Sequence, residues 1–132
     1  MGGPSVPPCG MAVAGPTRVS IVALPEAMPS TLMGLYDVLS SAGSMPTLDP
    51  PIVPEPFSVE IVAARRGTME LATGIPLDVR RSVDQVPSTD IVLVPSLLAP
   101  GGEWSSGRHP EVTDWIARMG EGGALLCSAC SG

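Results

Sequence analysis

Four short apolar runs divide the chain, and each has the composition of a buried β-strand. They cover residues 18–24 (RVSIVAL), 57–64 (FSVEIVAA), 90–95 (DIVLVP) and 124–129 (ALLCSA). Aliphatic and β-branched side chains fill these runs with few polar interruptions, a pattern typical of parallel strands that are covered on both faces. The pattern therefore predicts four strands of one sheet.

Two segments between these runs have the period of an amphipathic helix. Ser30 can cap the first helix, and Pro110 suits the first position of the second. In both segments apolar side chains recur at i, i+3, i+4 and i+7, which places them on one helix face. The two apolar faces consist of Leu32, Leu35, Tyr36 and Leu39, and of Val112, Trp115, Ile116 and Met119.

A hairpin and two linkers complete the predicted elements. Residues 67–79 (GTMELATGIPLDV) favour a short β-hairpin that turns at Thr73-Gly74. Residues 44–56 form a proline-rich connection, and residues 82–90 form a linker with one helical turn. The order strand, helix, strand, hairpin, strand, helix, strand predicts an α/β fold. We expect a flavodoxin-like, doubly wound, mostly parallel sheet with helices on both faces and a small β-hairpin.

Composition limits the class of protein. The 132 residues suit one domain, and because aromatics make up only 3% the core must be aliphatic. The net charge of −6 provides no general attraction to nucleic acid or to an anionic membrane. No apolar stretch is long enough to span a bilayer. Residues 1–17 lack the pattern of a signal peptide, and their glycines and prolines favour a disordered tail. We expect a cytoplasmic protein.

The chemistry that the sequence offers is concentrated in its last residues, GALLCSACSG. Cys127 and Cys130 are three positions apart. A zinc site needs four ligands, and His109 is the only histidine in the chain, so a metal site is disfavoured. A thioredoxin-like redox pair is also disfavoured, because Cys127 continues an apolar strand instead of opening a helix. Both thiols could instead simply belong to the core, where free cysteine is common.

A nucleophile elbow fits the same residues better. Its pattern is small-x-nucleophile-x-small between a strand and a helix, and Ser128 and Gly132 flank Cys130 at the required spacing. The residues two positions away face the neighbouring backbone in a strained turn and must be small. This hypothesis places the Cys130 thiol beyond a central strand, at the carboxyl edge of the sheet, with Cys127 buried inside it.

Several segments together resemble the ThiJ/PfpI superfamily, the class I glutamine amidotransferase-like fold. They are residues 18–43 (RVSIVALPEAMPSTLMGLYDVLSSAG), residues 57–96 with the hairpin TMELATGIPLDV and the run VDQVPSTDIVLVP, and GGALLCSACSG at residues 122–132. Within the superfamily they are most similar to the N-terminal sensor domains of AraC-type transcriptional regulators. The resemblance implies that Cys130 occupies the nucleophile position and that Ser96, Leu97 and Ser131 line a ligand pocket.

Two departures from the family pattern weaken an enzymatic role. The resemblance implies an acidic residue where Ser30 or Thr31 stands, and Glu26 is a weaker candidate for that acid. It also implies PGG after the third strand, where backbone N–H groups can form an oxyanion hole, but residues 95–97 are Pro-Ser-Leu. A leucine limits the close backbone approach that glycine permits.

Two functions from different classes follow from the resemblance. The favoured one is a ligand-sensing or structural domain of a transcriptional regulator that has an unknown small-molecule ligand and dimerises with a second copy. DNA would be bound only through a helix-turn-helix domain outside these residues. The alternative is a cysteine-dependent enzyme, such as an isocyanide hydratase, an amidase or a glyoxalase-like hydrolase. Neither implies a cofactor or a metal. We expect the chain to be the front portion of a larger domain, incomplete at its C-terminus and prone to self-association.

Four other features of the sequence have a structural interpretation beside a functional one. Glu26 is expected to be a solvated loop residue, and His109 is expected to cap the helix that starts at Pro110. Trp104 either lines a pocket or lies on the surface. The arginine pairs at residues 65–66 and 80–81 are expected to be solvated ends of strands.

Overall fold

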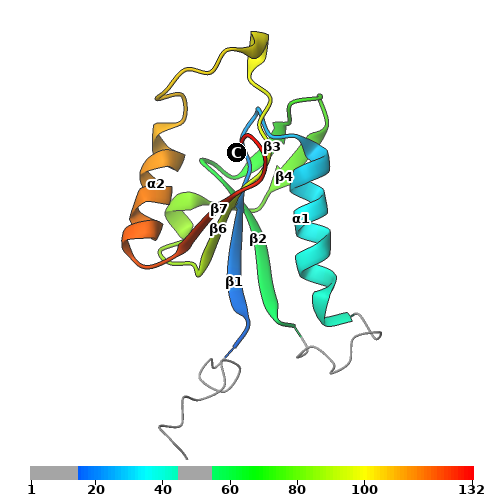
Figure 1. Ribbon diagram of the computed structural model, residues 1–132, viewed down its shortest axis with the longest axis vertical. Coiled ribbons are helices and arrows are strands. Elements are labelled where there is room, and N and C mark those ends of the chain that lie inside the picture. The colour runs from blue at the N-terminus through cyan, green and yellow to red at the C-terminus, as the bar shows by residue number, and fades with distance from the viewer. Residues whose placement is uncertain (1–14, 45–54) are drawn as a thin grey trace, which may run out of the picture.

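The structure is a computed structural model of the 132-residue chain, and it describes residues 15–44 and 55–132 (Figure 1). Most of the predicted tail and of the proline-rich connection lies outside these residues. The strands are β1 (Thr17–Val22), β2 (Phe57–Ala63), β3 (Gly67–Glu70), β4 (Pro76–Val79), β5 (Arg81–Ser82), β6 (Ile91–Val94) and β7 (Leu125–Ser128). The helices are α1 (Pro29–Ser41) and α2 (Pro110–Glu121), with 3-10 turns η1 (Ala42–Ser44), η2 (Val83–Gln85) and η3 (Pro100–Gly102).

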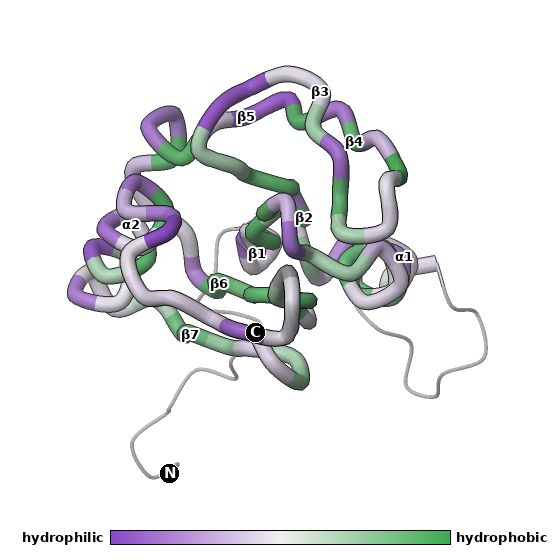
Figure 2. Tube along the Cα trace, turned by 90° about the horizontal axis from the view of Figure 1, so that it is seen from above, coloured by the Kyte–Doolittle hydropathy of each residue, from purple (hydrophilic) through white to green (hydrophobic). Residues whose placement is uncertain are grey.

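Five of the strands form one parallel sheet in the order β5-β2-β1-β6-β7. Helices α1 and α2 lie on opposite faces of this sheet, as the view from above shows (Figure 2). Strands β3 and β4 pair antiparallel as a separate hairpin. The predicted doubly wound α/β fold with a small hairpin is therefore confirmed. The two-residue β5 was not predicted.

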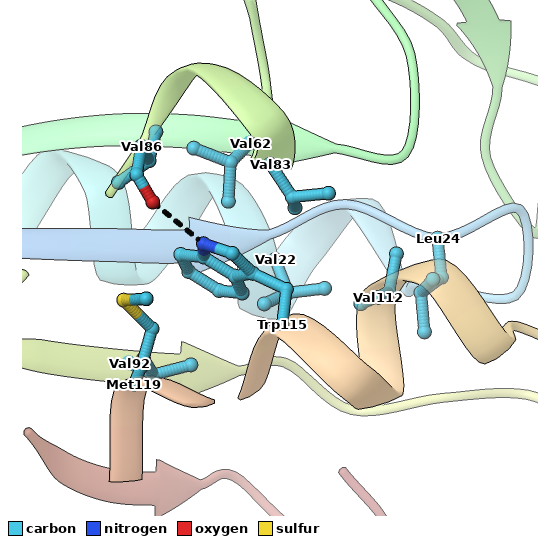
Figure 3. Close-up of a cluster of buried hydrophobic side chains, with 9 residues drawn as sticks. All are labelled: Val22, Leu24, Val62, Val83, Val86, Val92, Val112, Trp115 and Met119. Carbon is cyan, nitrogen blue, oxygen red and sulfur yellow. Dashed lines mark hydrogen bonds between the residues drawn. The ribbon is translucent and has the colours of Figure 1, made fainter. Parts of the chain in front are cut away.

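Hydrophobic packing fills both faces of the sheet. On the α2 face, Trp115 is fully buried at the centre of a mainly valine cluster, and its indole N–H donates to the carbonyl oxygen of Val86 at 2.8 Å (Figure 3). On the α1 face, Leu32 is fully buried among side chains of β1 and β2. The alternation along β1 serves both layers, since Ile21 belongs to the α1 cluster and Val22 to the α2 cluster.

Helix α1 begins differently from the prediction. Met28 is the N-cap, Pro29 holds the first helical position, and no side chain caps the helix. The prediction that Ser30 is the cap is therefore wrong. Proline at the first position has the right φ and lacks an N–H that would need a partner, so the helix starts one residue before Ser30. The hydroxyl of Thr31 donates instead to the carbonyl oxygen of Met28, at 3.1 Å.

Strand β7 is more exposed than its apolar sequence predicted. It pairs with β6 and forms the edge of the five-stranded sheet. Leu125 and Leu126 are 60% and 48% exposed, and Cys127 is only partly buried. Among the described residues no strand lies beyond β7, so both faces near this edge remain partly open. An apolar strand sequence shows that its side chains are suited to burial, but it does not show whether a neighbouring element covers them.

Within residues 15–44 and 55–132, the helices are too short or too polar to cross a membrane.

Candidate functional site

The candidate site lies where β1, β6 and β7 end. All three strands are parallel, so the loops that follow them meet at one edge of the sheet, beside the C-terminus (Figure 1). The loop after β1 leads to α1 and the loop after β6 leads to α2, on opposite faces of the sheet. The carboxyl ends of β1 and β6 therefore form the topological switch point, the place where open α/β sheets bind ligands.

The loops after β1 and β6 are joined by their backbones. The amide of Met28 donates to the carbonyl oxygen of Ser96, and the amide of Leu98 donates to that of Glu26, both at 2.8 Å. Between these bonds, Ala27 and Leu97 form an antiparallel bridge. The two loops are thus joined to each other across the switch point by backbone hydrogen bonds.

Cys130 lies in the turn that follows β7. Its φ is +55°, in the left-handed region that side chains other than glycine rarely adopt. The turn is held by the amide of Ala129, which donates to Val94 O at 2.9 Å, and by the amide of Gly132, which donates to Ala129 O at 3.0 Å. The thiol residue is exposed, and Cys127 and Cys130 are both free cysteines. The strained backbone is the one that an elbow requires, while a nucleophilic role for Cys130 stays a prediction.

Gly132 shows why the elbow spacing demands small residues. A Cβ atom at this position would lie 2.9 Å from the carbonyl carbon of Val94 and still closer to the carbonyl oxygens of Val94 and Pro95. These are backbone atoms at the end of the neighbouring strand, and they cannot shift at a low cost in free energy. Residue 132 must therefore be glycine for the turn to keep this position against β6.

The three predicted pocket residues lie together. The hydroxyl of Ser131 accepts from the amide of Leu97 at 3.0 Å and donates to its carbonyl oxygen at 2.8 Å, and it lies 3.3 Å from the hydroxyl of Ser96. The amide of Ser96 donates to the hydroxyl of Thr31 at 3.1 Å. Hence both amides at the expected oxyanion-hole position are already hydrogen-bonded to the chain's own hydroxyls.

Glu26 is buried, so the prediction of a solvated loop residue is wrong. Its side chain is 3% exposed, and both carboxylate oxygens have side-chain partners. Oε1 is paired with the guanidinium of Arg108, and Oε2 lies 2.8 Å from Nε2 of His109. The physical reason is that the loop before α2 folds back over the loop after β1 and brings both partners to the carboxylate, which makes its burial tolerable.

His109 also differs from its predicted role. It occupies the N-cap position of α2, but its side chain makes no capping hydrogen bond and instead reaches Glu26. Arg108, which sequence reasoning missed, places its guanidinium carbon 5.7 Å from the centroid of the Trp104 ring, within the range of a cation–π contact. Trp104 itself is 51% exposed. Together, Glu26, Trp104, Arg108 and His109 form what we call the Glu26 cluster.

Glu26 and Cys130 are not paired. Among the described residues no hydrogen bond joins the two side chains, since the Glu26 carboxylate is occupied by Arg108 and His109. The same residues contain no group of three or more metal-ligating side chains. The site therefore consists of two parts, a strained cysteine turn clamped to the β6 loop and a buried carboxylate clamped to the α2 loop.

Comparison with solved structures identifies the fold. The chain superimposes on Drosophila melanogaster DJ-1beta with a TM-score of 0.67 and 20% identity over 89% of this chain and 56% of that one. It matches a THiJ/PfpI family protein from Pseudomonas syringae with a TM-score of 0.66 and 14% identity, over 89% of this chain and 43% of that one. The fold is that of the DJ-1/ThiJ/PfpI superfamily.

A regulator is among the proteins with this DJ-1/ThiJ/PfpI fold. An AraC family transcriptional regulator from Pseudomonas putida matches with a TM-score of 0.63 and 18% identity, over 86% of this chain and 55% of that one. The chain spans about half the length of the solved structures that it matches. No protein-family model and no curated protein matches its sequence. The resemblance predicted from the sequence is therefore confirmed for the fold.

Proposed function

We propose that the chain is the ligand-sensing portion of an AraC-type transcriptional regulator, in which the DJ-1/ThiJ/PfpI fold is kept without cysteine chemistry. The observation that carries this proposal is the hydrogen bonding of Ser96 and Leu97. An acyl-transfer or hydration site needs free donors aimed at a developing oxyanion. Here the two amides donate to the hydroxyls of Thr31 and Ser131 instead.

The missing acid supports the same conclusion. The resemblance implies a carboxylate beside the thiol at position 30 or 31, and this chain has hydroxyl side chains at both. Thr31 is engaged with the backbone at Met28 and Ser96. Glu26, the other candidate acid, is held by the side chains of Arg108 and His109. Neither candidate acid position therefore supplies a free carboxylate to accept a proton from Cys130.

The regulator role also agrees with the charge and the structural likeness. The net charge of −6 is unsuited to DNA, so DNA would be contacted through a separate helix-turn-helix domain. The likeness to the Pseudomonas putida regulator supports this arrangement. The ligand is a small molecule that binds at the switch point, and the protein works as a homodimer in the cytoplasm.

One observation favours the alternative, a cysteine-dependent enzyme. Cys130 is exposed and has the strained φ that an elbow gives to its nucleophile. The coding sequence downstream of Gly132 separates the two functions. We expect it to continue into a helix-turn-helix with clustered arginines. A stop codon soon after the remaining helices and strands of the fold would favour the enzyme.

A further inference from the structure

Glu26 is a buried carboxylate that does not serve Cys130, and its burial calls for a function of its own. An isolated carboxylate is costly to bury, and proteins keep one inside only when it is paired. The side chain of Glu26 is 3% exposed and sits at the switch point, where this fold class binds ligands. A buried anionic group in that place is suited to binding a cation.

Arg108 and His109, the two residues that pair with the Glu26 carboxylate, come from one long loop. Residues 95–109 connect β6 to α2, with only the three-residue turn η3 as regular structure. A loop of this length with so little secondary structure is unusual in a compact domain and is commonly functional. Near its start, the amide of Leu98 donates to the backbone carbonyl of Glu26. At its end, Arg108 and His109 pair with the Glu26 carboxylate, so one residue holds the loop at both ends.

Arg108 is bound as a separate cationic ligand would be. Its guanidinium is paired with a buried carboxylate and lies over the Trp104 ring. A carboxylate combined with an aromatic face is a general arrangement for holding an organic cation. The Arg108 side chain is 32% exposed, so this position opens to solvent.

We propose that Glu26 and Trp104 form a cation subsite, that Arg108 is its internal occupant, and that a small organic cation can take Arg108's place and bridge Glu26 to the loop of residues 98–108 through Trp104. The proposal rests on the sensing role for its biological purpose, because replacement of Arg108 by a ligand would change how this loop is held. Tethering gives Arg108 an effective concentration on the order of millimolar. A free cation therefore binds the wild-type chain weakly and the chain without Arg108 more tightly.

The experiment measures amide hydrogen exchange by mass spectrometry in the Arg108→Ala variant, with N-ethylguanidinium as the probe. Removing one partner of a buried charge pair weakens the segment that it holds. We expect exchange in peptides from residues 97–109 to rise about tenfold or more, while peptides from β1 stay unchanged. Ethylguanidinium at about 10 mM, on the order of the effective concentration that tethering gives Arg108 in the wild type or somewhat above it, should restore slow exchange.

Two further variants isolate the subsite. The double variant Glu26→Gln with Arg108→Ala should show the same fast exchange and no response to ethylguanidinium, because the anionic group is gone. Arg66→Ala removes an exposed arginine outside the cluster and should exchange like the wild type. Sodium chloride at the same ionic strength serves as the control for screening.

Each outcome decides the proposal. Unchanged exchange in Arg108→Ala would show that the arginine does not fasten the loop, and fast exchange that ethylguanidinium does not reduce would show that the position is an ion pair only. If Arg108→Ala is not folded by circular dichroism, ethylguanidinium should restore its folding and should not do so for the double variant; no recovery overturns the subsite. Such a failure would leave the sensing role standing, because that role is tested by the downstream sequence.

Discussion

Replacement of Trp115 should remove a large part of the stability of this domain. Trp115 is the largest fully buried side chain, and it joins α2 to the valines of the sheet and of the segment after β5 (Figure 3). Its indole N–H also supplies the hydrogen bond to the carbonyl oxygen of Val86. Trp115→Ala therefore removes both packing and a buried donor.

The magnitude follows from these two contacts. Truncation of a buried tryptophan to alanine costs about 3–5 kcal/mol, against a total stability of roughly 5–15 kcal/mol for a domain. Trp115→Phe keeps most of the apolar volume but leaves the Val86 carbonyl without its donor, which costs about 1–3 kcal/mol. We thus expect the order wild type, Trp115→Phe, Trp115→Ala in decreasing free energy of unfolding.

Urea unfolding followed by far-ultraviolet circular dichroism measures these differences. Trp104→Ala is the matched control, because the same side chain is removed where it is half exposed. Its loss is limited to the contact with Arg108, worth about 0.5–1 kcal/mol at an exposed site. The reasoning would be refuted if Trp115→Ala stayed within about 1 kcal/mol of the wild type at an equal dependence on urea, or if the Trp104 control were the more damaging change.

Three further predictions concern single contacts. The backbone N–H and the side chain of Arg18 donate to Asp90 and hold the pKa of its carboxyl below the usual 3.8. Asp90→Asn should therefore lower stability at pH 7 by less than about 1 kcal/mol, because the pair is exposed, and this difference should vanish as the pH falls below 3.8 and Asp90 protonates. Ser131→Ala should speed amide exchange at Leu97 about tenfold through loss of its acceptor. Leu125→Lys should reduce self-association of the chain in sedimentation, since charge on an edge strand opposes pairing.

Each of these predictions has a control and a contrary outcome. A stability difference for Asp90→Asn that persists in acid would contradict the Asp90 argument. Ser105→Ala changes an exposed serine of the same loop and should leave Leu97 unaffected; equal effects would contradict the clamp. Val38→Lys alters an exposed apolar residue on α1, 61% exposed, and should not change association. A monodisperse wild-type monomer at micromolar concentration would contradict the expectation that β7 pairs with other chains.

The helices, the main strands and the hairpin could be predicted from local sequence pattern, because the interactions that form them act mainly between residues close together in the chain. The apolar stripe of α2 placed Val112, Trp115 and Met119 on one face, and all three are buried. The turn at Thr73-Gly74 lies between β3 and β4, as predicted. Strand β5 was not predicted, because two residues are too few to show the alternating pattern of a strand.

The ion pairs of the Glu26 cluster could not be predicted in the same way. Glu26 and Arg108 are brought together by the topology of the sheet, and no spacing along the chain reports such a contact. An isolated glutamate next to a proline has the composition of a solvated loop, which is why burial was not expected. The apolar pattern of β7 did not indicate the exposure of Leu125 and Leu126 for a similar reason, since exposure depends on which strand lies beside them and not on the residues themselves.

Cys130-dependent turnover tests the central claim most directly, namely that this fold is kept here without cysteine chemistry. The wild-type chain and Cys130→Ser would each be incubated with methylglyoxal and, separately, with an alkyl isocyanide, and product formation compared with a protein-free blank. Removal of the partners that activate a catalytic nucleophile costs several orders of magnitude in rate. Because the Ser96 and Leu97 amides are engaged by the hydroxyls of Thr31 and Ser131, the account predicts that both proteins match the blank. Turnover by the wild type that is lost in Cys130→Ser would contradict it.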